Sequence, residues 1–386
     1  MLAPEPFFQA RGTPISVFFR NRALSDMGHE IDLITYPLGE DVDIPRLRII
    51  RIPNLFGFKK IKIGPSWVKV PLDILLFLRA ALQLARKRYD IIFSHEEAAL
   101  PGVVLGKIWR IPHIYDMHSS LPQQLENFDF SRSPLLKKIF SRMESFILKN
   151  SQAVIVICQD LLRQVREAGV GNKSILIENF IDFPSPEFSS DDIRLRRAQY
   201  APSGEKIVLY AGNFGPYQGV QLIVDAAALV KEKAVFLLVG GSAAAQEALR
   251  REAESKGIAG KVIFVDRVPP SDVPLFISIA DVLVSPRLSG TNTPLKIYSF
   301  LKSGKPLVAT DLWTHTQVLN DRISILVEPT AEGMAEGLVF ALTAEEAKER
   351  ARAALAFASR EYTYPAYLDR MKRCLDTALG FRPVRR

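Results

Sequence analysis

Short apolar runs rich in β-branched residues alternate with amphipathic segments along the chain, and no other feature of the sequence constrains its fold as strongly. Most of these runs are apolar at every position, as expected of parallel strands that helices cover on both faces. They are too many for one typical sheet, so the sequence predicts two α/β domains. The predicted strands are EIDLITY (30–36), LRIIRIP (47–53), YDIIFSH (89–95), HIYDMH (113–118), AVIVIC (153–158), SILIENF (174–180), KIVLYAG (206–212), AVFLLVGG (234–241), KVIFV (261–265), DVLVSP (281–286), PLVAT (306–310) and SILVEP (324–329).

Glycine and proline mark the ends of several elements. The first three residues, Met-Leu-Ala, look like the end of a further strand because Pro4 must stop it, so this strand is clipped or begins upstream. Residues 182–192 are rich in Pro, Ser and Asp and predict a linker between domains 1–182 and 183–364. Helical patterns that need a left-handed residue at their end close at Gly28, Gly169, Gly257 and Gly304.

The composition is that of a globular protein, with 48% hydrophobic and 24% charged residues among 386. Cys158 and Cys374 each stand alone, which excludes a disulfide framework and a cysteine zinc site and favours a reducing compartment. The net charge of +8 favours an anionic partner, namely a phosphate, a nucleotide, a nucleic acid or an acidic membrane. We recognise no secretory signal, and the most apolar helix candidate, residues 71–85, is too short to span a membrane, so we expect a cytoplasmic protein.

Several motifs of known chemistry are missing. The sequence has no G-x-G-x-x-G after a strand, no P-loop, no H-E-x-x-H and no G-x-S-x-G. Asp41-Val42-Asp43 has the form of a metal-binding Asp-x-Asp triplet, but a solvated turn before Pro45 is the simpler interpretation. We therefore expect neither a metal nor a cofactor.

Two loops that follow predicted strands carry groups suited to an anion. In YAGNFGPYQG (210–219), glycines let backbone amides and a helix start approach a phosphate, although an ordinary turn has the same pattern. In SPRLSGTNTPLK (285–296), small polar residues lead into a helix, with Pro294 suited to its first turn. Lys296, which we expect to be an exposed loop cation, is mildly unfavourable at this end of a helix unless an anion binds there. The alternative is a simple helix cap, for which one Ser or Thr suffices.

Two histidines stand at the ends of predicted strands. His118 closes the triplet Asp-Met-His, and His95 precedes two glutamates. The carboxyl ends of parallel strands are where α/β sheets present residues to ligands. A structural histidine is the common alternative at each position.

Seven lysines and arginines, without an acid, lie between Asp43 and Asp73. Phe56, Phe58 and Trp67 are interspersed among them. Basic and aromatic residues together suit a membrane interface that contains anionic lipid, and they also suit nucleic acid. A solvated loop is the alternative. The predicted surface covers residues 46–69, and its cations are Arg46, Arg48, Arg51, Lys59, Lys60, Lys62 and Lys69.

The sequence as a whole resembles the retaining glycosyltransferases of family 4. The resemblance implies the GT-B fold, in which two Rossmann-like parallel-sheet domains face a central cleft, with the acceptor on the first domain and the donor on the second. The matching segments follow the family's order over nearly the whole chain: LAPEPFFQARGTPIS (2–16), IPHIYDMHSS (111–120), IENFID (177–182), YAGNFGPYQG (210–219), VGGS (239–242), VIFVDRVPPSDVPLFISIADVLVSPR (262–287) and TNTPLKIYSFLKSGKPLVAT (291–310).

The resemblance also implies a set of site residues. His118 would contact the donor sugar, and Lys296 would neutralise the leaving diphosphate, whose charge grows in the transition state. The amides around Gly12 would face the donor phosphate. The remaining donor-binding residues would be Gly212, Asn213, Gln218, Gly241, Val268, Thr291, Asn292, Thr293 and Ser299.

This chain departs from the family pattern at the donor site. Asn213 and Gln218 stand where the family often has Arg and Lys. The usual pair of glutamates is missing, with Ser299 in place of the second and Thr291 or Ser289 in place of the first. Hydroxyls, amides and Lys296 would then hold the donor in place of carboxylates.

The resulting hypothesis is a glycosyltransferase that moves a sugar, with retention, from a nucleotide-sugar donor to a lipid-linked or polysaccharide precursor of the cell envelope. We expect the protein at the inner face of the membrane without a nucleic acid partner, and we leave its oligomeric state open. The last helix, residues 365–381, would pack back on the first domain. A nucleotide-sugar epimerase and a catalytically silent scaffold are the alternatives, and the missing glutamates favour the scaffold.

Overall fold

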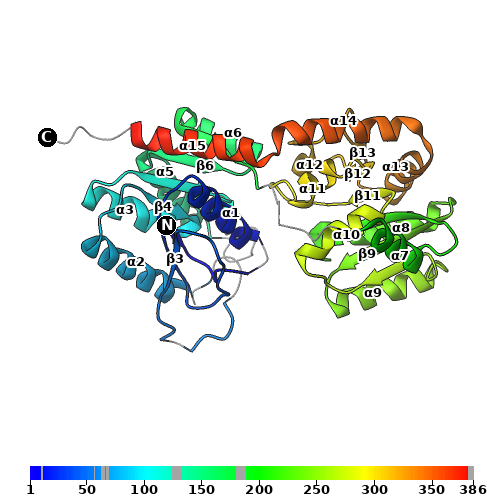
Figure 1. The fold of residues 1–386 in the computed structure, drawn as a ribbon, viewed down its shortest axis with the longest axis horizontal. Coiled ribbons are helices and arrows are strands. Elements are labelled where there is room, and N and C mark those ends of the chain that lie inside the picture. Colours follow the sequence, from blue (N-terminus) through cyan, green and yellow to red (C-terminus); the bar gives the residue numbers. More distant parts are fainter. Residues whose placement is uncertain are drawn as a thin grey trace. The chain divides into compact units, whose positions relative to one another are not determined.

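The computed structural model describes residues 1–9, 12–55, 57–61, 66, 69–123, 133–179 and 188–380. The chain forms two compact units, one of Met1–Asn179 with Pro365–Arg386 and one of Phe180–Tyr364. Each unit is a parallel sheet with helices around it (Figure 1), so the predicted α/β architecture is confirmed. Among the described helices, none combines the length and the apolar character needed to cross a bilayer.

The sheet of unit 1 has seven parallel strands in the order β3-β2-β1-β4-β5-β6-β7. The short β1 lies at its centre, where Leu2 is paired with Ile34 on one side and Ser94 on the other. The predicted apolar runs therefore form strands in both halves of this sheet. The strands are β1 (Leu2–Ala3), β2 (Ile31–Thr35), β3 (Leu47–Arg51), β4 (Ile92–His95), β5 (His113–Met117), β6 (Ala153–Val156) and β7 (Ser174–Leu176).

Helices cover both faces of this sheet, as the uniformly apolar strands require. Successive side chains of a strand point to opposite faces, and in β2 Leu33 packs with Val17 while Ile34 packs with Leu72. The helices that carry Val17 and Leu72 therefore lie on opposite faces. The helices of this unit are α1 (Gly12–Asp26), α2 (Lys69–Arg86), α3 (Ala99–Trp109), α5 (Pro134–Asn150), α6 (Gln159–Glu167) and α15 (Tyr364–Gly380), with short 3₁₀ turns η1 (Glu96–Ala98) and η2 (Gly171–Lys173).

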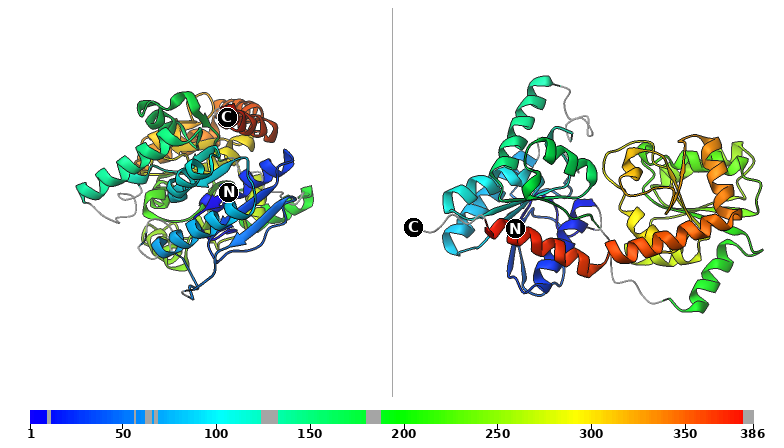
Figure 2. Two further views of the ribbon diagram at one scale, coloured as in Figure 1. Left: turned by 90° about the vertical axis from the view of Figure 1, so that its left-hand side faces the viewer. Right: turned by 90° about the horizontal axis from the view of Figure 1, so that it is seen from above.

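The sheet of unit 2 has six parallel strands in the order β10-β9-β8-β11-β12-β13. Helices lie on both sides of it (Figure 2). The strands are β8 (Lys206–Gly212), β9 (Ala234–Gly240), β10 (Val262–Val265), β11 (Val282–Ser285), β12 (Leu307–Thr310) and β13 (Ile325–Val327). The helices are α7 (Ser190–Tyr200), α8 (Val220–Leu229), α9 (Ala243–Ser255), α10 (Val273–Ile279), α11 (Lys296–Lys302), α12 (Trp313–Thr316), α13 (Ala331–Thr343) and α14 (Glu345–Glu361), with 3₁₀ turns η3 (Pro216–Gln218) and η4 (Pro270–Asp272).

The predicted helix ends and linker have different outcomes. Four glycines close helices with a positive φ, at Gly28 (90°), Gly169 (76°), Gly257 (69°) and Gly304 (67°), as predicted. The linker prediction is wrong at its end, because residues 190–192 form the first turn of α7. Ser189 accepts a hydrogen bond from the amide of Asp192, whose carboxylate accepts one from the amide of Ser189. This reciprocal capping starts a helix inside the polar stretch. Residues 182–187 lie outside the described part of the chain.

Candidate functional site

The two polar loops that the sequence analysis identified meet at the carboxyl-end edge of the unit 2 sheet, where its strands end. They follow β8 and β11, which are neighbouring parallel strands. The amide of Leu288, in the second loop, donates to the carbonyl of Tyr217, in the first, at 3.0 Å. Residues far apart in sequence are thereby brought together where parallel sheets present residues to ligands.

Lys296 begins α11 and turns its ammonium group inward. The Nζ atom lies 3.7 Å from the centroid of the Tyr210 ring and is buried without a hydrogen-bond partner among the described residues. Burial and the neighbouring charge of Arg287 lower the pKa of Lys296 well below its usual value. The sequence interpretation of Lys296 as an exposed loop cation is therefore wrong, because the ring of Tyr210 covers its charged end.

Arg287 is a second cation at this edge. Its Nη1 donates to the carbonyl of Asn292 at 2.6 Å and to the hydroxyl of Thr314 at 2.8 Å, which fixes the guanidinium. Its Nε is buried without a partner within the described residues, and burial lowers the pKa of this side chain. The guanidinium also lies 5.3 Å from the centroid of the Tyr217 ring.

Within the described ranges, neither Lys296 nor Arg287 forms a salt bridge with a carboxylate. The hydroxyl of Thr293, also buried, has no partner there either. Both cationic residues are half-buried, but the Nε of Arg287 and the Nζ of Lys296 are themselves buried. Buried charged groups without a counter-charge are costly unless an anion joins them. The arrangement is therefore suited to an anionic ligand, and phosphate oxygens are ligands that such groups bind well.

The first loop, residues 210–219, contributes mainly backbone groups to this edge. Gly219 caps α8 with φ +67°, and a Cβ there would lie 2.1 Å from the carbonyl oxygen of Pro286, so only glycine fits. Asn213 uses its side chain inside the loop, accepting from the amide of Gly215 at 3.0 Å and donating to the hydroxyl of Tyr217 at 3.3 Å. Gln218 is buried beside the start of α8. The side chain of Asn213 thus shapes the loop that precedes the helix.

Some of the other predicted donor residues lie near Lys296, whereas packing explains others. Gly212 lies beside Lys296, whose Nζ would be 2.7 Å from an added Cβ. Gly241 faces the ring of Phe214, which an added Cβ would meet at 2.6 Å, so packing alone explains this glycine. Val268 packs against the core, and Ser299 lies one turn after Lys296 on α11. Thr291 and Asn292 offer backbone carbonyls to Gln317 and Arg287.

In unit 1, His118 follows β5 and belongs to a buried polar cluster. Its Nε2 lies 3.1 Å from Nδ1 of His95, and the two rings stack. Both rings lie 3.5 Å from the carboxylate of Asp116. Burial lowers the pKa of His95 to about 3, so this histidine is neutral. The neutral ring of His95 therefore stacks on the ring of His118.

Asp116 is held by a cation that the sequence analysis missed. Arg20, on α1, donates to its carboxylate at 2.8 Å, and both side chains are fully buried. Although burial opposes it, the charge of Arg20 holds the pKa of Asp116 well below its usual range. Arg20 also donates to the hydroxyl of Tyr367 on α15 and to the carbonyl of Ile177 at 3.0 Å. The available signal was a charge inside the apolar stretch ISVFFRNRAL (15–24).

His95, Asp116 and His118 place three ligand-type atoms within 4.8 Å of one another, which raises the question of a metal site. Arg20 bonds one oxygen of the Asp116 carboxylate, and its fixed positive charge opposes a second cation. We therefore assign these residues to a hydrogen-bonded network. Gly12 begins α1 with φ +38°, and an added Cβ would meet no atom of the described residues within 4 Å.

The predicted basic surface, residues 46–69, is less free than its sequence suggests. Arg48 donates twice to Asp32, at 2.9 and 2.6 Å, and Arg51 pairs with Asp41 at 2.6 Å. Lys69 pairs with Glu97 at 2.5 Å. Lys59 and Lys60 are exposed, whereas Phe56, Lys62 and Trp67 lie outside the described residues.

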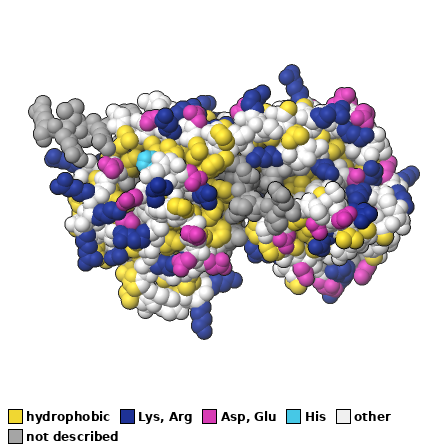
Figure 3. Space-filling model, in the orientation of Figure 1, with side chains coloured by type: hydrophobic (Ala, Val, Ile, Leu, Met, Phe, Trp, Pro, Cys, Tyr) yellow, Lys and Arg dark blue, Asp and Glu magenta, His cyan; other side chains and the backbone are white. Residues whose placement is uncertain are grey.

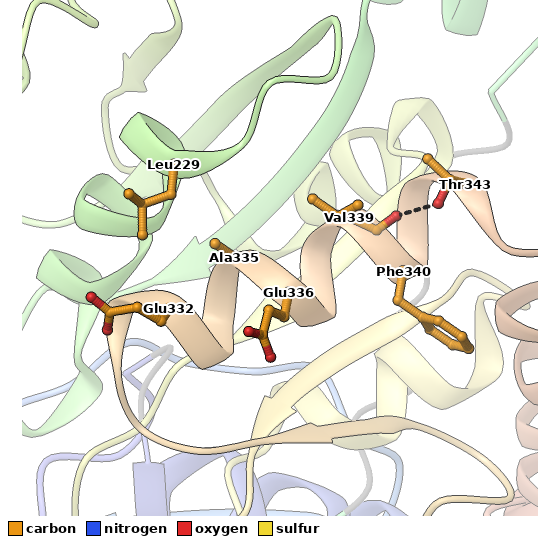
Figure 4. Close-up of a pocket in the computed structure, with 7 residues that line it drawn as sticks. All are labelled: Leu229, Glu332, Ala335, Glu336, Val339, Phe340 and Thr343. Atoms are coloured by element: carbon orange, nitrogen blue, oxygen red, sulfur yellow. Dashed lines mark hydrogen bonds between the residues drawn. The ribbon is translucent and has the colours of Figure 1, made fainter.

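A shallow hollow of about 580 Å³ lies between α8 and α13 (Figure 4). Leu229 faces it from α8, while Glu332 and Glu336 line it from α13. Its carboxylates make it unsuited to an anionic ligand. The edge that carries Arg287 and Lys296 is therefore the better candidate for an anion site.

Comparison with known proteins gives consistent matches. Family models described as "Glycosyl transferases group 1" and "Glycosyl transferase 4-like domain" match residues 191–355 and 21–179. A phosphatidyl-myo-inositol mannosyltransferase of Mycobacterium tuberculosis is 23% identical over 397 residues, covering 98% of this chain and 97% of that protein. The structure resembles sucrose-phosphate synthase from Thermosynechococcus elongatus, with a TM-score of 0.77 at 19% identity over 98% of this chain and 99% of the other. It also resembles Anabaena Alr3699/HepE in complex with UDP, with a TM-score of 0.77 at 18% identity over 97% and 99%.

Proposed function

The chain belongs to the group 1 glycosyltransferases, and on this premise we propose that it moves a sugar from a nucleotide-sugar donor to an acceptor with retention of configuration. The observation that carries the donor assignment is the pair of half-buried cations, Arg287 and Lys296, each with a buried nitrogen and without a carboxylate beside it in the described chain. A nucleoside diphosphate supplies the missing negative charge. UDP is also the ligand named for one of the similar structures.

We assign the donor diphosphate to the edge formed by the two loops of unit 2. The start of α8 directs backbone amides outward, and Gly212 leaves room beside Lys296. Charge grows on the leaving diphosphate during transfer, so a fixed ammonium there lowers the barrier. Arg287 and Lys296 would thereby take over from the family's phosphate-loop cations, which Asn213 and Gln218 replace.

For the sugar and the acceptor, the proposal rests on the family resemblance. His118 would contact the donor sugar, and Thr291, Asn292, Thr293 and Ser299 would face the donor in place of glutamates. A lipid-linked or polysaccharide precursor is the proposed acceptor, and the M. tuberculosis relative is itself named for a phosphatidyl-inositol substrate. We include peripheral association with the inner face of the membrane in this proposal.

Calorimetry with UDP-, GDP- and TDP-sugars tests the donor assignment. The wild-type protein should bind one of these nucleotides, and Lys296→Met should weaken that binding. Lys231→Met, which removes an exposed lysine of the same unit, should leave it unchanged. A catalytically silent scaffold, favoured by the missing glutamates, predicts no transfer by a protein that binds the donor, and a scaffold without a donor site predicts no binding at all.

Chelation should leave transfer intact. Arg287 and Lys296 already supply two cations at the proposed diphosphate site, and Arg20 opposes a metal at the histidine cluster. Activity with the identified donor is measured before and after dialysis against EDTA. Loss of activity that magnesium or manganese restores would contradict this expectation.

Donor binding should be coupled to proton uptake. Burial and the charge of Arg287 lower the pKa of Lys296, and a bound phosphate favours its charged form. Affinity for the nucleoside diphosphate should therefore fall as pH rises. Calorimetry in two buffers of different ionisation enthalpy measures the uptake, and Lys296→Met should abolish it. Equal uptake in that variant would assign the proton to another group.

A further inference from the structure

The exposed side of α5 carries a row of large apolar residues. Leu135 is 67% exposed, Ile139 48% and Phe146 39%. Spacings of four and seven residues place them on one side of the helix. Ile147 and Leu148 hold the other side of α5 against the core of unit 1. The first half of α5 extends away from the sheet (Figure 2, right), so Leu135 and Ile139 are on a projecting segment.

Two further large apolar residues, Ile108 and Trp109, are exposed at the end of α3. The ammonium of Lys107 lies 4.8 Å from the centroid of the Phe146 ring, which joins the end of α3 to α5. We call the surface formed by Ile108, Trp109, Leu135, Ile139 and Phe146 the α5–α3 face.

Positive charges border this face. Lys138, Arg142 and Lys149 follow the apolar row along α5, and each is exposed. Within the described part of the chain, none of the three forms a salt bridge. The one acid on α5, Glu144, is bound by the amide of Leu121 at 2.6 Å. Lysine and arginine side chains also intermingle with hydrophobic ones over the part of unit 1 that holds α2 and α3 (Figure 3).

We propose that the α5–α3 face docks the protein on a bilayer that contains anionic lipid. Apolar side chains on a helix flanked by Lys and Arg suit the boundary between headgroups and acyl chains, with the cations at the phosphates. A neutral protein partner would offer no negative charge to Lys138, Arg142 and Lys149. The inference rests on the proposed function for its purpose, which is access to a lipid-linked acceptor.

This face is better suited to the role than residues 46–69. Three of the cations in that stretch already pair with carboxylates, whereas Lys138, Arg142 and Lys149 do not within the described residues. Each cation near an anionic surface strengthens binding about fivefold. Cations without a salt bridge, beside exposed apolar side chains, therefore contribute most to binding at an anionic membrane.

Flotation with vesicles tests the apolar part. Leu135→Ser with Ile139→Ser should reduce binding to vesicles of equal phosphatidylglycerol and phosphatidylcholine at least tenfold. Ile74→Ser with Leu78→Ser is the matched control, because these α2 residues are 55% and 54% exposed. A loss in the α2 variant as large as in the α5 variant would overturn the assignment to this face.

Charge reversal tests the electrostatic part. Lys138→Glu with Arg142→Glu should reduce binding at least tenfold at low salt, whereas Lys231→Glu with Arg322→Glu, exposed on unit 2, should have little effect. Equal binding to vesicles of pure phosphatidylcholine would exclude anionic lipid. Sedimentation that turns from dimer to monomer in the α5 variants, without vesicle binding by the wild type, would make the face an interface between copies.

Nucleotide calorimetry on the same variants separates this inference from the proposed function. The α5 variants should bind the donor as the wild type does, because the changed residues lie on unit 1 and the proposed donor site lies on unit 2. Vesicle binding without any nucleotide binding would leave the docking surface standing and reject the donor site. Nucleotide binding without vesicle binding would support the donor site and reject the docking surface.

Discussion

Lys296→Met should slow transfer about ten- to a hundredfold and at the same time raise the melting temperature of unit 2. The loss in kcat/KM follows from a charge-assisted hydrogen bond to phosphate, which is worth about 1.5–3 kcal/mol. Methionine keeps most of the bulk, so the change isolates the charge. No carboxylate offsets this ammonium within the described chain, so the donor is the partner that we assign to it.

The gain in stability has a separate cause. The Nζ atom of Lys296 is buried without a hydrogen-bond partner in the described structure. Leaving a buried polar group unpaired costs about 1–3 kcal/mol, and methionine removes that cost. One kcal/mol shifts the melting temperature of a unit of this size by about 2–4 °C.

The pH dependence of this gain has a definite sign. Because the folded-state pKa of Lys296 is lowered, the folded protein binds fewer protons than the unfolded chain. The penalty is therefore full at low pH and disappears as pH rises toward the ordinary value for lysine. The advantage of Lys296→Met should shrink over the same range.

Two measurements on one preparation check this prediction. Steady-state kinetics with the identified donor give kcat/KM, and calorimetric melting at several pH values gives the stability. Lys231→Met is the control for losing a lysine from unit 2. Wild-type turnover in Lys296→Met would remove this residue from the mechanism, and a lower melting temperature would make it a structural residue.

Arg20→Met should destabilise unit 1 by about 3–5 kcal/mol. The substitution leaves the carboxylate of Asp116 buried without its cation, and breaking a buried pair on one side has a cost of this size. It also removes the hydrogen bonds of Arg20 to Tyr367 and Ile177, which join α1 to α15 and to the segment after β7. At about 2–4 °C per kcal/mol, the melting temperature should fall by about 6–20 °C.

A matched pair in the same unit serves as the control. Arg48 also bonds an aspartate, Asp32, but its own side chain is mostly exposed. Arg48→Met should therefore cost no more than about 1 kcal/mol. The double variant Arg20→Met with Asp116→Leu should recover part of the lost stability, because no buried charge is left alone. Equal losses of stability in Arg20→Met and Arg48→Met would show that burial does not determine what the Arg20–Asp116 pair contributes to stability.

The pH dependence of the Arg20–Asp116 pair also has a definite sign. The pKa of Asp116 is held low in the folded protein, so the pair's stabilisation is present above the usual range for a carboxylate. It is lost as pH falls through the lowered value. The difference between wild type and Arg20→Met should therefore be largest near neutral pH and shrink in acid.

The sequence by itself determined the two parallel sheets and the helix ends. Runs such as KIVLYAG and AVFLLVGG are apolar at every position, and only strands covered on both faces bury such runs. Glycines such as Gly257 end helices because a left-handed backbone is a local property of one residue. The polar loops after β8 and β11 were also visible, since residue type and spacing define them.

Only the tertiary structure decided the surroundings of the charged side chains. Lys296 is covered by Tyr210, and Arg20 pairs with Asp116, so partners distant in sequence determine which charges are buried. Helix and strand periodicity reports which side of one element is apolar, but it carries no information on which residue of another element comes within bonding distance. Desolvation and pairing depend on that distance, and for this reason the exposed-loop interpretation of Lys296 was wrong and Arg20 was missed.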